Sequence, residues 1–138
     1  EYVKTLKNLA KRLKLDDVVV WAGAVHGANK SGAFAVAQVY ILPSLSENFG
    51  IAVVEAMAAS KPVIVSNGVP MHELIVQAGA GWAVSPEPQS ICTGILAAFA
   101  DPSRLTRMGQ SARALAEREY SETAMGERLQ AMYERIAN

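Results

Sequence analysis

Cysteine, net charge and long apolar runs are the features that this sequence has least of. Its single cysteine, Cys92, excludes a disulfide within the chain and favours a reducing compartment, so we expect a cytoplasmic protein. Thirteen basic and thirteen acidic residues give a formal net charge of zero, which is unlike the basic surface of a nucleic-acid-binding protein. The sequence contains no run of about 20 apolar residues, so it predicts no transmembrane helix.

Processing signals and metal motifs are also missing. The first residues, Glu-Tyr-Val-Lys, lack the uninterrupted apolar region of a signal peptide, and no initiator methionine precedes them. We therefore expect the chain to be a piece of a larger protein. It has no Asp-x-Asp motif and no cluster of histidine, cysteine and aspartate with metal-ligand spacing, so no metal site is predicted. Cys92 lies in an apolar helical stretch and is expected to be a buried structural thiol.

The length and composition indicate one globular domain. The chain has 138 residues, of which 51% are hydrophobic and 19% charged. A chain of this size buries about two thirds of its unfolded surface, which is enough to be stable alone. We assign residues 1–138 to a single domain whose last part, from about residue 88 to 138, is a helical tail. The apolar stripes of the tail are expected to be core or interface, with the last one partly exposed if its partner is absent.

Hydrophobic periodicity predicts alternating strands and helices. Apolar runs predict a buried strand at Val18–Ala22 and further strands at 39–42, 63–66 and 82–84, the last at the edge of the sheet. Asp101 or Ser103 is expected to cap a helix of the tail. This alternation is typical of an α/β fold with a Rossmann-like parallel sheet and flanking helices. Besides the helix after Gly50, helices are predicted at about 1–14, 31–37, 71–78, 90–100, 104–119 and 121–135.

The stretch from Pro43 to Pro62 concentrates the candidate functional residues. It reads as a loop and a helix between two strands, with Glu47 in the loop and Glu55 about one and a half turns into the helix. In an open parallel sheet, ligands bind beyond the carboxyl ends of the strands, where the next helix begins. The unpaired N–H groups of that helix and its partial positive charge suit a phosphate. Asn48 is expected as the N-cap, and Gly50 would let the backbone approach a ligand closely.

The two glutamates have different expected partners in such a site. Glu55 would accept two hydrogen bonds from a vicinal diol such as a ribose. Glu47, at the tip of the loop, would stand nearer to the group that is attached to the phosphate. A purely structural interpretation is that each carboxylate only offsets the helix dipole. The combination of a strand, Glu47, Gly50, Glu55, an alanine-rich helix and a second strand favours a binding site.

This combination resembles a family signature. The phrase "PSLSENFGIAVVEAMAASKPVIVS" has a glutamate, seven residues and a second glutamate, as do retaining glycosyltransferases of the GT-B type in the family 4 group (group 1). The segments "WAGAVHGANKSGAFAVAQVYILPS" and Asn67–Gly109 are similar to the same family, with Glu73 and Gly81 at its usual glutamate and glycine. The chain departs from the family at Gln38, where an aspartate is usual, and at Ser60, where a glycine is usual.

The resemblance implies the C-terminal half of a GT-B fold without its first strand, and a donor-binding role. The donor would be a nucleotide-diphosphate sugar whose hexosyl group is transferred with retention, without an obligatory metal or other cofactor. Glu47 would be the catalytic residue that contacts the donor sugar, together with the backbone near Asn48. Glu55 would hold the ribose, and His26 and Glu73 are further candidates. The diphosphate would be held by the amides of Phe49, Gly50 and Ile51, with Lys30 and Lys61 as candidates only by their proximity in the sequence.

Several alternatives follow from what this chain lacks. The basic pair of the family and the acceptor-binding N-terminal domain are not in the sequence, so we expect the chain alone to bind its donor weakly and to transfer no sugar. It could instead be a stand-alone nucleotide-sugar-binding module that acts with a separate acceptor domain. A GT-B-type nucleotide-sugar epimerase, or a domain that has lost donor binding, is a further alternative. No nucleic acid partner is expected, and the parent enzyme could associate peripherally with a membrane.

Overall fold

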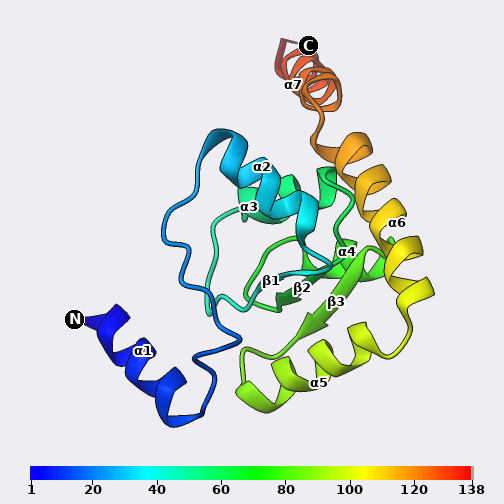
Figure 1. Cartoon of the computed structure of the whole chain (residues 1–138). Coiled ribbons are helices and arrows are strands. Elements are labelled where there is room, and N and C mark those ends of the chain that lie inside the picture. Colours follow the sequence, from blue (N-terminus) through cyan, green and yellow to red (C-terminus); the bar gives the residue numbers. More distant parts are fainter. Residues whose placement is uncertain (138) are drawn as a thin grey trace. The chain divides into compact units, whose positions relative to one another are not determined.

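The computed structural model describes residues 1–137 and divides the chain into two compact units (Figure 1). The first unit covers Glu1–Lys30 and the second begins at Ser31. Helix α2 (Gly27–Val36) begins in the first unit and ends in the second. Its first residue is four positions before residue 31, where the sequence predicted the helix to start. The sheet and the hydrophobic core are both in the second unit.

The first unit contains helix α1 (Tyr2–Arg12) and an irregular segment after it. Lys14 ends α1 in the left-handed conformation (φ 56°), and the N–H of Leu15 donates to the carbonyl of Ala10 at 2.9 Å, as in a Schellman motif. The predicted strand at Val18–Ala22 is wrong, because none of these residues is in a strand and Val20 is 89% exposed. A strand needs a neighbouring strand to pair its backbone N–H and C=O groups. An apolar run carries no information about whether that neighbour is available.

A three-stranded parallel sheet forms the centre of the second unit. Its order is β1 (Tyr40–Leu42), β2 (Val63–Ser66) and β3 (Gly81–Val84), and the register pairs Tyr40 with Val63 and Val63 with Gly81. The predicted bounds of β2 are confirmed, as is the position of β3 at an edge of the sheet. Gly81 is required here because a Cβ atom at this residue would lie 2.0 Å from the carbonyl oxygen of Val63.

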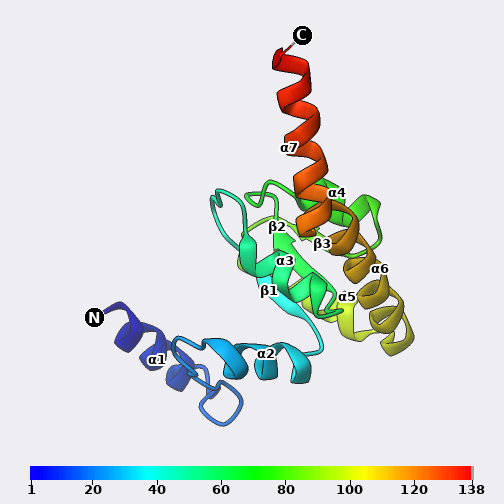
Figure 2. The same cartoon turned by 90° about the horizontal axis from the view of Figure 1, so that it is seen from above.

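Helices cover both faces of this sheet. Figure 2 shows α3 (Ile51–Ala58) over the sheet with α6 (Pro102–Tyr120) alongside it. Helix α4 (His72–Gln77) packs with them on this face, whereas α5 (Pro88–Phe99) packs on the opposite face through Gly94. The last helix is α7 (Glu122–Ala137). This arrangement confirms the predicted α/β fold with a Rossmann-like parallel sheet and flanking helices.

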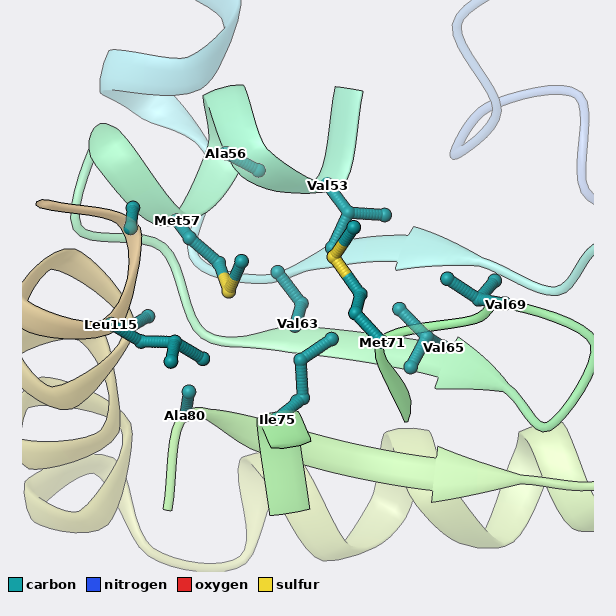
Figure 3. Packing of buried hydrophobic residues seen from close by; sticks show 12 residues of the cluster. Val53, Ala56, Met57, Val63, Val65, Val69, Met71, Ile75, Ala80 and Leu115 are labelled. Atoms are coloured by element: carbon teal, nitrogen blue, oxygen red, sulfur yellow. The ribbon is translucent and has the colours of Figure 1, made fainter. Parts of the chain in front are cut away.

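The core lies between the sheet and the helices α3, α4 and α6. Val63 and Val65 of β2 point toward this layer, where Figure 3 shows them beside Met57, Val53 and Ile75. These five side chains have no exposed surface, and Leu115 of α6 is 1% exposed. The neighbouring Ile64 points to the other face, where its Cγ2 would be 3.4 Å from a Cβ atom at Gly94. Because α3 follows the loop that leaves the carboxyl end of β1, its N-terminus stands at that edge of the sheet.

Of two predictions for the helical tail, one is wrong and one is confirmed. Cys92 is exposed, so the prediction of a buried thiol is wrong. Helix α5 instead presents its small residues Gly94 and Ala98 to the sheet, because a Cβ atom at Gly94 would already lie 2.9 Å from Val84. The expected partial exposure of the last apolar stripe is confirmed, with Met125 52% and Leu129 51% exposed.

Candidate functional site

The candidate site lies at the carboxyl ends of β1 and β2. After Leu42, the chain forms a loop over residues 43–50 that leads into α3, and after Ser66 it forms a turn over residues 67–70 that leads towards α4. Because β1 and β2 are parallel neighbours, both segments leave the same edge of the sheet. This is the edge where ligands bind in open α/β folds.

The loop and the turn are joined by two hydrogen bonds. The buried hydroxyl of Ser66 donates to the carbonyl of Ser44, and the N–H of Glu47 donates to the carbonyl of Gly68 at 3.1 Å. A Cβ atom at Gly68 would lie 2.5 Å from the carbonyl oxygen of Leu45. The loop that carries Glu47 is therefore packed directly against the turn.

Glu47 is half-buried and its carboxylate faces its own backbone. The N–H of Asn48 donates to Oε1 of Glu47 at 3.0 Å. The Cγ atom of Glu47 lies 3.5 Å from the place that a Cβ atom on Gly50 would take. The carboxylate is thus held in the loop immediately before the first turn of α3, as the sequence predicted.

The start of α3 differs from the prediction in one respect. The N-cap is Gly50 rather than Asn48, and no side chain caps this helix. Gly50 has φ 82°, a left-handed conformation that most residues adopt only at a cost. An N-cap side chain such as Asn requires extended backbone instead, so the left-handed turn displaces the helix start to Ile51. The prediction of an N-cap at Asn48 is therefore wrong.

This turn leaves several amides without an acceptor. Within residues 1–137, the N–H groups of Phe49, Gly50 and Ile51 donate no hydrogen bond. Gly50 is buried, whereas Ile51 is 62% exposed and Phe49 is 44% exposed. A helix N-terminus with unpaired N–H groups and a partial positive charge can accept an anionic group from solvent.

The negative charges of Glu55 and Glu47 both affect the pKa of Tyr40. Glu55 lies half-buried in the second turn of α3, and Tyr40 begins β1. Burial raises the pKa of the Tyr40 hydroxyl, and the negative charges of Glu55 and Glu47 raise that pKa further. Both carboxylates therefore lie close enough to influence the same hydroxyl. The pattern of two glutamates did not reveal Tyr40, because its aromatic ring at the start of a strand is equally typical of a core residue.

Phe49 has an aromatic partner that sequence reasoning also missed. Its ring meets that of Tyr120 edge to face, with 5.7 Å between the centroids. Tyr120 is the last residue of α6, and burial raises the pKa of its hydroxyl, as does the charge of Glu119. Residues so far apart in the chain share no local pattern, so only the packing of α6 against α3 brings them together.

Two further candidates, Glu73 and Lys61, are in the second unit, whereas His26 and Lys30 are in the first. Glu73 is 78% exposed, and its Oε1 is 4.0 Å from Nε2 of His72. In the part of the chain that the structure describes, its carboxylate accepts no backbone hydrogen bond. His26 is exposed in the first unit, and Lys30 is in the same unit, so their roles stay predictions. Lys61 is at the amino end of β2, where its Nζ donates to the carbonyl of Ala35 at 2.9 Å. Its suggested diphosphate contact is therefore wrong, since it is at the opposite end of the strand.

One pocket of the structure lies away from the two glutamates. A pocket of about 510 Å³ lies near the amino ends of β1 and β2 and includes Gln38, Lys61, Phe99 and Thr106. Neither Glu47 nor Glu55 lines this pocket. Among residues 1–137, no helix combines the length and apolarity needed to cross a membrane. The same residues contain no group of three or more potential metal-binding side chains.

Comparison with known proteins identifies the family of this chain. A family model described as "Glycosyl transferases group 1" matches residues 1–115. A D-inositol 3-phosphate glycosyltransferase of Streptomyces scabiei is 34% identical over 113 residues, which are 81% of this chain and 25% of the relative. The chain thus spans about a quarter of the length of that relative.

Solved structures share the fold. The C-terminal domain of a glycosyl transferase group 1 family protein from Francisella tularensis superposes with a TM-score of 0.76 at 24% identity, over 88% of this chain and 63% of that one. Anabaena Alr3699/HepE in complex with UDP and glucose superposes with a TM-score of 0.84 at 24% identity, over 97% of this chain and 36% of that one. The site at the carboxyl edge of the sheet and the match over most of the chain lead to one assignment: this chain belongs to the glycosyl transferases group 1 family.

Proposed function

We propose that this chain is the donor-binding part of a retaining glycosyltransferase of the family 4 type, which transfers a hexosyl group from a nucleotide-diphosphate sugar. The observation that carries the proposal is the first turn of α3. There, the N–H groups of Phe49, Gly50 and Ile51 have no acceptor in the described chain, the Glu47 carboxylate accepts from the neighbouring amide of Asn48, and Glu55 follows in the second turn. The UDP and glucose in the complex of Anabaena HepE, which has a similar fold, support a donor of this class.

Each group in the turn has a role in this proposal. The amides of Phe49, Gly50 and Ile51 hold the diphosphate, and the helix N-terminus stabilises the negative charge that develops as the sugar leaves. The carboxylate of Glu55 accepts hydrogen bonds from the ribose hydroxyls. Glu47 contacts the donor sugar, and the hydrogen bond from the N–H of Asn48 fixes the orientation of its carboxylate. None of these roles requires a metal ion or another cofactor.

The acceptor side is assigned to another part of the protein. The chain spans about a quarter of the length of the curated relative described above, so we place acceptor binding in a separate domain. We propose that the parent enzyme acts in the cytoplasm. The isolated chain would then bind a donor without transferring its sugar. Sugar transfer by the purified chain would refute this part of the proposal.

Calorimetric titration of the chain tests donor binding. UDP, GDP and ADP, each with its glucose or mannose conjugate, are titrated into the wild type and into Glu55→Ala. The wild-type chain should bind the nucleotides of one of the three bases saturably. The variant should bind them roughly 10- to 100-fold more weakly, because a hydrogen bond to a charged group contributes about 1.5–3 kcal/mol. Glu87→Ala is the matched control, since Glu87 is an exposed glutamate whose side chain caps no N–H at the start of α5. Absence of binding to every nucleotide, or equal binding by Glu55→Ala, would contradict the proposal.

A further inference from the structure

A buried hydroxyl links the end of β2 to the loop that carries Glu47. Ser66 is a polar residue with no exposed surface, and among residues 1–137 the other fully buried side chains are hydrophobic. Its Oγ donates to the carbonyl of Ser44, two residues after β1 ends. A buried hydroxyl without a partner would be unfavourable, so this bond ties the two segments together.

Gly68 holds the same loop from the other side of the turn. Its carbonyl accepts the N–H of Glu47 at 3.1 Å. A Cβ atom at Gly68 would lie 2.5 Å from the carbonyl oxygen of Leu45 and 2.6 Å from that of Ser44. These atoms belong to the backbone, so the loop can occupy its observed position only because residue 68 has no side chain. Ser66 and Gly68 together form what we call the β2 clamp.

The loop has little burial of its own. Leu45 is 84% exposed, and Pro43 and Ser46 are also exposed. Buried apolar side chains therefore do not fix the loop between Leu42 and Glu47. The contacts of this loop with Ser66 and Gly68 therefore set the position of the loop relative to the sheet.

The position of this loop decides where Glu47 stands. The Cγ atom of Glu47 is 3.5 Å from the position of a Cβ atom on Gly50, at the start of α3. Glu55, in contrast, is in the second turn of α3, which is anchored by the buried Val53, Ala56 and Met57. A shift of residues 43–47, which the clamp contacts, would therefore move Glu47 relative to the helix N-terminus at the buried Gly50 and leave Glu55 in place.

We propose that Ser66 and Gly68 are positioning residues that set the distance between Glu47 and the first turn of α3, and thereby determine how the donor sugar is held. This inference rests on the proposed function, in which Glu47 contacts the sugar and Glu55 the ribose. On this inference, the β2 clamp affects binding of the sugar part of the donor through the position of Glu47. The nucleotide part is held by groups that the clamp does not touch.

The first measurement needs no ligand. Amide hydrogen exchange of the whole chain is followed by NMR in the wild type, Ser66→Ala and Gly68→Ala. Exchange of the Glu47 N–H should be about tenfold faster in both variants, because its bond to Gly68 is no longer held in place. Ile64→Val is the matched control, since it weakens the packing of β2 from the opposite face of the sheet. In Ile64→Val, the ratio of the exchange rate of the Glu47 N–H to the exchange rates of the β2 amides should be the same as in the wild type.

The second measurement compares two ligands on the same variants. Titrations use the nucleoside diphosphate that the wild type binds and its sugar conjugate. In Ser66→Ala, the affinity for the sugar conjugate should fall about tenfold and that for the nucleoside diphosphate should change less than twofold. Addition of Glu47→Ala to Ser66→Ala should cause no further loss, because both changes remove the same contact. A general loss of stability would lower both affinities together.

Two outcomes would overturn the inference. One is an unchanged exchange rate of the Glu47 amide in Ser66→Ala and Gly68→Ala. The other is a faster exchange rate combined with equal losses of affinity for the nucleoside diphosphate and its conjugate. If the wild type binds no nucleotide, the proposed function fails. The exchange measurement then still decides whether the clamp positions the loop.

Discussion

At the scale of single residues, the end of α3 shows a strained position. Ser60 adopts φ 60°, and the N–H of Lys61 donates to the carbonyl of Ala56 at 3.0 Å. The N–H of Ser60 also donates to the carbonyl of Met57 at 2.9 Å, which completes a Schellman motif. The resemblance had pointed to a glycine at this position, and the left-handed backbone gives the physical reason for one.

Ser60→Gly is expected to stabilise the chain. The left-handed conformation costs a residue with a side chain about 1–2 kcal/mol, and the greater freedom of glycine in the unfolded chain offsets about 0.5–1 kcal/mol of the gain. The free energy of unfolding should therefore rise by about 0.5–1 kcal/mol, measured by urea denaturation. Gly79→Ser is the reciprocal control, because Gly79 ends α4 with φ 64° and has no atom within 4 Å of an added Cβ. It should lower the free energy of unfolding, and a change of both variants in the same direction would contradict the argument.

At the scale of elements, the approach of α6 to the end of α3 depends on a glycine. A Cβ atom at Gly109 would lie 2.4 Å from the carbonyl oxygen of Ser60 and 3.5 Å from Cδ of Pro62. The helix therefore passes directly over the connection between α3 and β2. This close contact is what lets Met108 and Ala112 of α6 enter the core.

Gly109→Ala is expected to destabilise the chain although alanine favours helices. Moving α6 away from the carbonyl of Ser60 would open the core, at a cost of about 1–3 kcal/mol. Gly126→Ala is the matched control, since Gly126 is in α7 and has no atom within 4 Å of an added Cβ. It should raise helix stability by up to about 1 kcal/mol. Chemical denaturation of both variants measures the difference, and equal effects would refute the steric argument.

Asp101 caps α6 and makes its stability depend on pH. Its carboxylate accepts hydrogen bonds from the hydroxyl of Ser103 and from the N–H groups of Arg104 and Ser103, which lower the pKa of Asp101 from 3.8. A lowered pKa in the folded state means that the stabilisation is complete above the unfolded pKa. It is lost as the pH falls through the folded pKa. The prediction that Asp101 or Ser103 caps this helix is confirmed for Asp101.

The pH dependence can be isolated with Asp101→Asn, which keeps an acceptor oxygen but does not titrate. At pH 6, the wild type should be more stable than this variant, because its cap is charged at the positive end of α6. The difference should shrink as the pH falls below about 4. Urea midpoints measured between pH 3 and pH 6 test this. A difference that is constant over the whole range would show that the cap charge contributes nothing.

At the scale of the whole molecule, burial is unevenly distributed along the chain. Every residue of β2 is fully buried, whereas α1 buries only Ala10 and α7 buries no residue. Helices without buried contacts open locally at little cost, because few interactions are lost when they do. The stable part of the chain therefore centres on the sheet and the layer that contains α3 and α6.

Hydrogen exchange measured by mass spectrometry should reproduce this distribution. Amides of β2 should exchange only through global unfolding, whereas amides of α1 and α7 should exchange faster, by at least about 100-fold. Denaturant should accelerate exchange of β2 much more than exchange of either terminal helix. Slow exchange of α1 or α7, with the same denaturant dependence as β2, would contradict this distribution.

The sequence by itself determined the features that depend on local pattern. The apolar run at 63–66 became β2, the alternation of strands and helices became a parallel α/β sheet, and the capping residue Asp101 began α6. The pair of Glu47 and Glu55 was also evident from its place between two predicted strands, and the charges of both glutamates raise the pKa of Tyr40. These features are local because hydrophobic periodicity and capping involve residues within a few positions of one another.

Only the tertiary structure decided the features that join distant residues. Val18–Ala22 is as apolar as β2, yet it forms no strand, since strand formation depends on a neighbour that the run does not encode. The exposure of Cys92, the contact of Phe49 with Tyr120 and the β2 clamp on the Glu47 loop also follow from packing. Gly68 shows the reason most directly: it reads as an ordinary turn glycine, but the carbonyl of Leu45 leaves no room for any side chain. Steric fit between segments depends on where each segment lies in space, and no local pattern carries that information.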